Sequence, residues 1–160
     1  MTSTPKTTVA NELTAEASKA LGKGYGDSPR LAELRAAGMA AAERLEMPAP
    51  VQRPWKYLDV ASFDVRTYRP AMSTRAPASP SALAREYGIL EHVAATLFQV
   101  DGTTVAGEVN AEGLQIADFS NADDDLRAII GERLGTAVSP DKNRFDALHY
   151  AFLRGGVAVH

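Results

Sequence analysis

The sequence predicts an α+β fold in which an N-terminal helical region precedes a small antiparallel sheet. Three patterns indicate it: a capped stripe of leucines and small residues over residues 28–47, strand-like segments on both sides of Asp101-Gly102, and an apolar helix pattern over 120–135. The chain has 160 residues, of which 45% are hydrophobic, so one domain can bury a packed core.

The first 26 residues differ from the rest of the chain. Residues 1–26 are predicted to be a flexible N-terminus with one weak helix over residues 11–21, which Gly22 is expected to end. The three glycines of GKGYG, residues 22–26, predict a flexible joint, and a phosphate-loop interpretation fails because no buried strand precedes them. Residues 27–160 are expected to form the domain itself.

The helix predicted over residues 28–47 has clear boundaries. Ser28 is a suitable N-cap, Pro29 fits the first helical position, and Pro48 is expected to end the helix. Its apolar stripe consists of Leu31, Leu34, Gly38, Ala41 and Leu45. Small residues in the middle of this stripe would allow a partner helix to approach closely.

The segment after this helix is rich in proline. An aromatic, strand-like stretch is predicted over residues 53–67 and a proline-rich loop over residues 70–81. A short helix is expected over residues 83–87. Strands are predicted over residues 93–100 and 103–109, joined by the hairpin dipeptide, and a third over 114–119, which together suggest one small antiparallel sheet.

Two helices and a strand complete the chain. Ser120 and Asp123 form a capping-box pattern, and Gly135 closes the helix. Its apolar face is Leu126, Ile129, Ile130 and Leu134. A further helix is expected to restart at Ser139-Pro140 and to present Phe145, Leu148 and Phe152. Gly155-Gly156 then break it, and Val157 to Val159 begin a strand.

Composition excludes several classes of function. A net charge of −3 argues against a basic nucleic-acid groove, and the absence of cysteine excludes disulfides and thiolate metal sites. The first twenty residues contain no apolar core of a secretory signal, and no run approaches the ~20 apolar residues of a membrane span. We therefore expect a cytoplasmic protein with no membrane or nucleic-acid partner.

Candidate chemical sites have simpler structural explanations. The acidic run Asp123 to Asp125 lacks the alternating pattern of a calcium loop, and its position at a helix start accounts for it. The three histidines are too scattered to bind a metal together, and His149 is expected to be a buried or half-buried structural residue. No nucleophile elbow is present, so we expect no catalytic residues, no metal and no cofactor.

One cluster remains unusual. The stretch RPWKYLD contains Arg53, Trp55, Lys56, Tyr57 and Asp59, and includes the single tryptophan of the chain. Trp and Arg are frequent hot-spot residues of protein interfaces. Alternatively, Trp55 would fix the end of the preceding helix to the core, with Tyr57 packing further along. The cluster is thus a candidate interface or structural anchor.

Two stretches resemble the SufD proteins of the SufB/SufD family. RPWKYLD resembles the family's W-K/R-Y-T-D/N element, and residues 142–160 resemble its F-x-A-L-N-x-A-F segment followed by a glycine and a valine. The matching residues are Trp55, Lys56, Tyr57 and Asp59, then Phe145, Ala147, Leu148, Ala151, Phe152, Gly156 and Val159. Leu58 stands where the family has Thr, and His149 where it has Asn. The resemblance covers roughly residues 28–160.

The resemblance implies a fold and partners. SufD-like proteins assemble with SufB-like and SufC-like proteins into the cytoplasmic SufBCD complex for iron–sulfur cluster assembly, and their N-terminal region leads into a right-handed parallel β-helix. Residues 156–160 would then be the first β-helix strand. This chain would be the N-terminal region alone, a non-catalytic scaffold for protein–protein contacts that lacks the family's cluster-linked positions.

Two other functions stay open. The chain is alternatively a stand-alone interaction module that dimerises through its Ala/Gly-rich helix, or an enzyme whose site has no recognisable motif. Self-association of the fragment through the edge of Val157 to Val159 is also expected, because a strand edge presents unpaired N–H and C=O groups.

Overall fold

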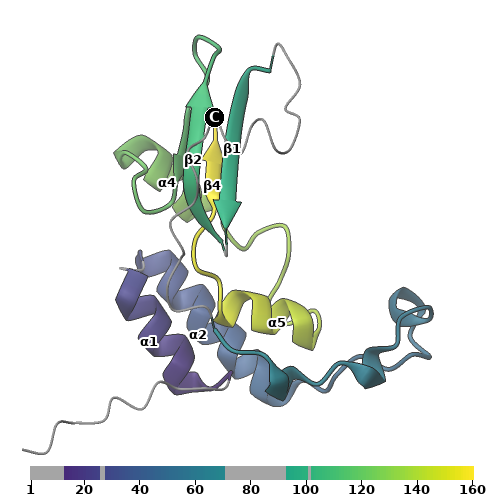
Figure 1. Cartoon of the computed structure of the whole chain (residues 1–160). Helices are drawn as coiled ribbons and strands as arrows, with labels where there is room; N and C mark the ends of the chain where they lie inside the picture. The colour runs from purple at the N-terminus through teal and green to yellow at the C-terminus, as the bar shows by residue number, and fades with distance from the viewer. Residues whose placement is uncertain (1–12, 26–27, 71–92, 101) are drawn as a thin grey trace, which may run out of the picture.

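The protein is known from a computed structural model that describes residues 13–25, 28–70, 93–100 and 102–160. Within these residues it contains helices α1 (Ala15–Tyr25), α2 (Pro29–Arg44), α4 (Asp124–Arg133) and α5 (Arg144–Ala151), and strands β1 (Ala95–Val100), β2 (Thr103–Val109), β3 (Ile116–Asp118) and β4 (Val157–Val159). Figure 1 shows α1, α2 and α5 at one end of the molecule and the strands with α4 at the other. The predicted small α+β fold is confirmed.

Helix α1 is longer at its C-terminal end than its sequence suggests. The hydroxyl of Thr14 accepts a hydrogen bond from the backbone N–H of Ala17 (3.2 Å) at its start. The helix continues through Gly22 to Tyr25, so the expected stop at Gly22 is wrong and the expected joint over 22–26 is helical for most of its length. Gly22 is buried against the rest of the protein, and such packing outweighs the helix penalty of about 1 kcal/mol for a glycine.

Helix α2 begins as predicted and ends earlier. The Ser28 hydroxyl accepts a hydrogen bond from the N–H of Leu31 (3.3 Å), which confirms the N-cap. The helix ends at Arg44 instead of residue 47, because Leu45 adopts an extended conformation. The carbonyl of Leu45 accepts a hydrogen bond from the guanidinium of Arg144 (3.2 Å), which holds this chain reversal against α5.

The small residues of α2 lie directly against α5. A Cβ atom on Gly38 would lie 2.7 Å from the carbonyl oxygen of Ala147 and 2.7 Å from the backbone nitrogen of Ala151. Ala41 and Ala42 form a buried cluster with Ala147. The partner helix that the stripe predicted is therefore α5 of the same chain.

A buried arginine joins the three helices of this end. Arg35, 4% exposed, donates from its guanidinium to the carbonyls of Ala151 (3.0 Å) and Leu153 (2.6 Å). The hydroxyl of Ser18 on α1 donates to the same Ala151 carbonyl (2.6 Å). The last carbonyls of a helix lack intrahelical partners and carry partial negative charge, so this cation stabilises the C-terminus of α5.

The predicted hairpin is present. Strands β1 and β2 pair antiparallel from Ala95 opposite Val109 to Val100 opposite Thr103, with one irregularity in the register. Gly102 at the tip has φ +75°, a value that glycine adopts without strain.

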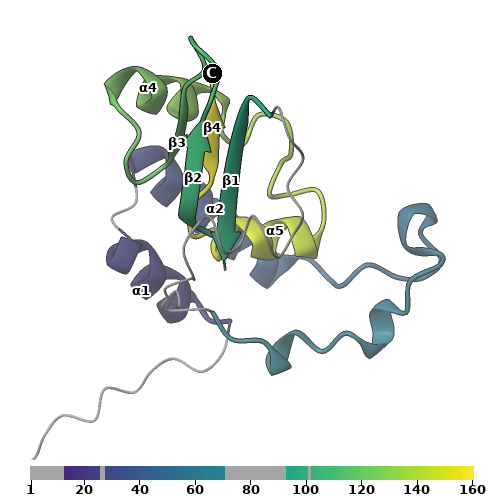
Figure 2. The same ribbon diagram turned by 45° about the horizontal axis from the view of Figure 1, so that its top comes forward.

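The third predicted strand belongs to a second sheet. Strand β3 pairs antiparallel with β4, with Ile116 opposite Val159 and Asp118 opposite Val157, so the single sheet expected from the sequence is two sheets of two strands. The C-terminal strand is therefore paired along one edge within the chain. In Figure 2 strand β4 is seen between β1 and β2, and α4 lies on the side of β3.

Asp118 connects these strands to α4. Its buried carboxylate accepts hydrogen bonds from the N–H and hydroxyl of Ser120 (3.0 and 2.8 Å) and from the N–H of Thr104 (3.2 Å). Burial alone would raise the pKa of Asp118, but these hydrogen bonds outweigh it and lower the pKa. Ser120 is thus not the predicted cap: Asp123 caps α4, accepting from the N–H of Leu126 (2.9 Å).

The structure confirms the predicted buried face of α4 and corrects two expectations about α5. Leu126 and Ile130 of α4 are buried as predicted. Helix α5 begins at Arg144, capped by the side chain of Asn143, and not at Ser139. His149 is exposed, so its expected burial is wrong.

The strand expected over residues 53–67 is absent. Its place is taken by three 3₁₀ turns, Arg53–Trp55, Val60–Ser62 and Val65–Thr67. Asp59 and Asp64 cap the second and third turns through their side chains, and such local hydrogen bonds compete with strand pairing. We call residues 49–69 the arm.

Some expectations concern residues that the structure does not describe. They are the start of the first helix at residues 11–12, the proline-rich loop from residue 71 to 81, the short helix over residues 83–87 and the hairpin residue Asp101.

Candidate protein-interaction surface

The arm projects from the helical end of the molecule. It leaves the C-terminal end of α2 and extends beyond α5 in both views (Figures 1 and 2). Its hydrogen bonds are local: the N–H of Ser62 donates to Asp59 (3.2 Å) and the N–H of Arg66 donates to Asp64 (3.0 Å). The turns of the arm are thus formed by its own residues.

Aromatic contacts attach the arm to α5. The ring of Phe145 lies 5.2 Å from the ring of Trp55 and 5.2 Å from that of Phe63, measured between centroids. Phe63 also stacks on Tyr68 at 4.8 Å. Aromatic pairs at these separations contribute about 0.5–1.5 kcal/mol each beyond area burial. Phe145 is therefore the point at which the base of the arm is attached.

The arm also exposes large apolar side chains. Val51 is 90% exposed, Tyr57 88%, Leu58 55% and Tyr68 50%. Single exposed apolar residues are ordinary, but several on one projecting segment are typical of a protein-binding surface.

The five residues singled out in the sequence divide between these two roles. Trp55 is half-buried and contacts Phe145, so it attaches the arm to α5. Arg53, Lys56, Tyr57 and Asp59 are exposed, and the Lys56 ammonium lies 5.4 Å from the centre of the Tyr57 ring. The expectation that Tyr57 packs against the core is wrong, because the 3₁₀ turn directs it outward.

Sequence reasoning missed part of this surface. Val51, Leu58 and Tyr68 carry no periodic signal, because the arm is neither helix nor strand. Phe145 was expected on the packed face of its helix, but nothing in the sequence indicated that it would contact Trp55.

An ion pair stabilises the third turn of the arm. The Arg66 guanidinium donates to both carboxylate oxygens of Asp64, at 2.8 Å each. These hydrogen bonds hold the pKa of Asp64 below its ordinary value and that of Arg66 above its own. Since both groups are exposed, the pair orders the third turn without contributing to the core.

Outside the arm, the described residues offer little support for a metal site or for a general base. Residues 13–25, 28–70, 93–100 and 102–160 hold no cluster of three or more His, Cys, Asp or Glu able to bind a metal ion. A cavity of about 470 Å³ beside the hairpin includes Asp118, whose hydrogen bonds and lowered pKa make it a poor general base near neutral pH. Among the helices described, none has the length and apolar character to cross a membrane.

No protein-family model, curated protein or solved structure matches this chain.

Proposed function

We propose that this chain is the N-terminal region of a SufD-like component of the SufBCD complex, a non-catalytic scaffold that contacts its partners through the arm. The proposal rests on the two SufD-like stretches of the sequence and on one structural observation. That observation is the projecting arm, which exposes Tyr57 and Leu58 beyond an aromatic attachment to α5.

The arm is suited to binding because it is ordered before a partner arrives. Attachment through Trp55 and Phe63 reduces the conformational entropy that the segment would lose on binding. Burial of an exposed Leu side chain contributes about 1.5–3 kcal/mol, and a Tyr ring adds a large contact area. Tyr57 and Leu58 together can therefore dominate a protein interface, with Arg53 and Lys56 at its polar rim.

The alternative module, dimerising through its Ala/Gly-rich helix, has less support from the geometry. The Gly38 face of α2 is covered by α5, so such a dimer would have to use the exposed alanines on the other side of α2.

Binding to isolated partners tests the proposal. The chain is immobilised, and SufB-like and SufC-like proteins from the same genome are passed over it in turn. We expect one of them to bind, and the double variant Tyr57→Ser, Leu58→Ser to bind at least about tenfold more weakly, which corresponds to about 1.4 kcal/mol. Val138→Ser is the control, since Val138 is an exposed apolar side chain, 39% exposed, that lies outside the arm.

Two outcomes would contradict different parts of the proposal. If the unmodified chain binds neither partner, the SufD-like assignment fails. If it binds one of them and the arm variant binds equally well, the assignment stands but the arm is not the contact.

A further inference from the structure

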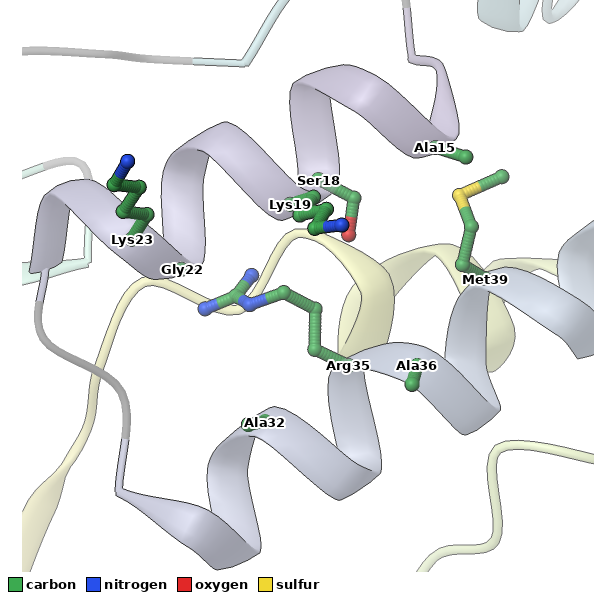
Figure 3. Close-up of a pocket in the computed structure, with 9 residues that line it drawn as sticks. All are labelled: Ala15, Ser18, Lys19, Gly22, Lys23, Ala32, Arg35, Ala36 and Met39. Atoms are coloured by element: carbon green, nitrogen blue, oxygen red, sulfur yellow. The ribbon is translucent and has the colours of Figure 1, made fainter.

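A groove lies between α1 and α2, on the side of α2 that α5 leaves open (Figure 3). Its volume is about 770 Å³ and its walls are mainly apolar. The wall on α2 consists of Ala32, Arg35, Ala36 and Met39, at positions i, i+3, i+4 and i+7. This spacing is a single face of a helix, the pattern with which helices pack against one another.

The opposite wall has the same periodicity. On α1 the groove is lined by Ala15, Ser18, Lys19, Gly22 and Lys23, at positions i, i+3, i+4, i+7 and i+8. Small side chains on both walls let a third backbone approach closely. The seven steps from Ala32 to Met39 on α2 correspond to about 10 Å, or two turns of helix, at 1.5 Å per residue. The groove thus has the dimensions of two turns of a third helix.

The groove is positively charged although the chain is acidic overall. Among the residues that the structure describes, its lining contains Lys19, Lys23 and Arg35 and no carboxylate, whereas the whole chain has a net charge of −3. The side chains of Lys19 and Arg35 extend into the space between the helices (Figure 3). Neither lysine forms an ion pair with the part of the chain that the structure describes.

We propose that this groove binds an amphipathic α-helix of a partner protein, with acidic residues beside an apolar stripe two turns long. Two facing walls at helical spacing favour a helix over an extended peptide, because apolar anchors at i, i+3, i+4 and i+7 match them turn for turn. The lysines favour an acidic helix through charge complementarity. The groove is separate from the arm, so this inference does not depend on the proposed function.

Two synthetic helices test the inference on the full chain. Both are 16-residue peptides with leucines at i, i+3, i+4 and i+7; one carries glutamates beside this stripe and the other carries lysines at the same positions. Fluorescence anisotropy measures their binding at low and high salt. We expect the acidic peptide to bind at least about tenfold more tightly than the basic one at low salt, and this preference to weaken as salt screens the charges.

Substitutions on neighbouring positions of α2 locate the binding site. Ala36→Glu places a carboxylate in the groove. It should weaken binding of the acidic peptide at least about tenfold, because the new carboxylate repels the glutamates of the peptide. Ala37→Glu is the matched control, because Ala37 is exposed on the same helix but does not line the groove, and it should leave binding unchanged. The double variant Lys19→Glu, Lys23→Glu should reverse the preference in favour of the basic peptide. Circular dichroism confirms that each variant is folded.

Several results would overturn the inference. Equal affinity for the two peptides, equal loss in the Ala36 and Ala37 variants, or no binding of the acidic peptide would each do so. Sedimentation of the unmodified chain alone gives a further check. A dimer that Ala36→Glu abolishes and Ala37→Glu preserves would assign the groove to a second copy, and tighter peptide binding after deletion of residues 1–12 would assign it to the chain's own N-terminus.

Discussion

Replacement of Gly38 by alanine tests the packing of α2 against α5. A Cβ atom at this position would lie 2.7 Å from the carbonyl oxygen of Ala147, 2.7 Å from the backbone nitrogen of Ala151 and 2.8 Å from the Cβ of Tyr150. Carbon atoms pack at about 3.5–4.0 Å, and none of these three atoms is the mobile end of a long side chain. The two helices must therefore move apart.

The expected change in stability is the difference between two effects. Alanine favours a helix by about 1 kcal/mol over glycine. Overpacking of a tight core costs about 1–3 kcal/mol, and three close contacts with rigid atoms place Gly38 near the upper end. We therefore expect Gly38→Ala to lower the free energy of unfolding by about 2 kcal/mol, which lowers the melting temperature by roughly 4–8 °C in a domain of this size.

Urea denaturation followed by circular dichroism measures this change, with Gly131→Ala as the matched control. Gly131 also lies within a helix, but a Cβ atom there would meet nothing within 4 Å, so the same substitution should raise stability by about 0.5–1 kcal/mol. If Gly38→Ala stabilised the protein as much as Gly131→Ala does, the close approach of α5 to α2 would be refuted.

Three further predictions concern polar groups and the arm. Arg35→Met should lower the free energy of unfolding by about 1–3 kcal/mol, because it leaves the half-buried carbonyl of Leu153 without its donor and the carbonyl of Ala151 with the Ser18 hydroxyl alone; urea denaturation measures it, and a loss below about 1 kcal/mol would show that water replaces the guanidinium. Because the pKa of Asp118 is lower in the folded chain than the unfolded value of about 3.9, its stabilisation is present above about pH 4 and lost as the pH falls through the folded pKa. Asp118→Asn should accordingly destabilise the protein at pH 7 and do so much less near pH 2, and an equal effect at both would contradict this account. Trp55→Ala should speed chymotrypsin cleavage within the arm, whereas the pair Arg53→Ala, Lys56→Ala should change the unfolding free energy by less than about 0.5 kcal/mol; equal cleavage rates for the three proteins would show that the tryptophan does not attach the arm.

Local features followed well from the sequence. Ser28 caps α2, the residues around Gly102 form a hairpin, and Leu126 and Ile130 form the buried face of α4, as predicted. Each depends on residues within about one turn or one hairpin, so the physical cause lies in the adjacent sequence. The error at Ser120 has the same origin: two neighbouring residues could cap the helix, and the hydroxyl of Ser120 is used by Asp118 instead.

Features that join distant segments did not follow. Arginine normally lies on the surface of a helix, so the sequence gives no sign that Arg35 is buried. Its burial depends on carbonyls more than a hundred positions away. The candidate surface is similar: RPWKYLD was identified from its residue types, but which of its side chains attach and which are exposed depends on Phe145. The groove was not predicted, because its two walls come from separate helices.

The sequence by itself determined the fold class, the Ser28 cap of α2, the hairpin turn and the absence of cysteine chemistry, since these depend on residue type and short-range backbone preference. Only the tertiary structure decided that α5 covers the glycine face of α2, that β3 pairs with β4 and that the arm is attached at Phe145. The physical reason is that burial and hydrogen bonding of one segment depend on which other segment covers it. Nearness in the sequence does not indicate which segment that will be.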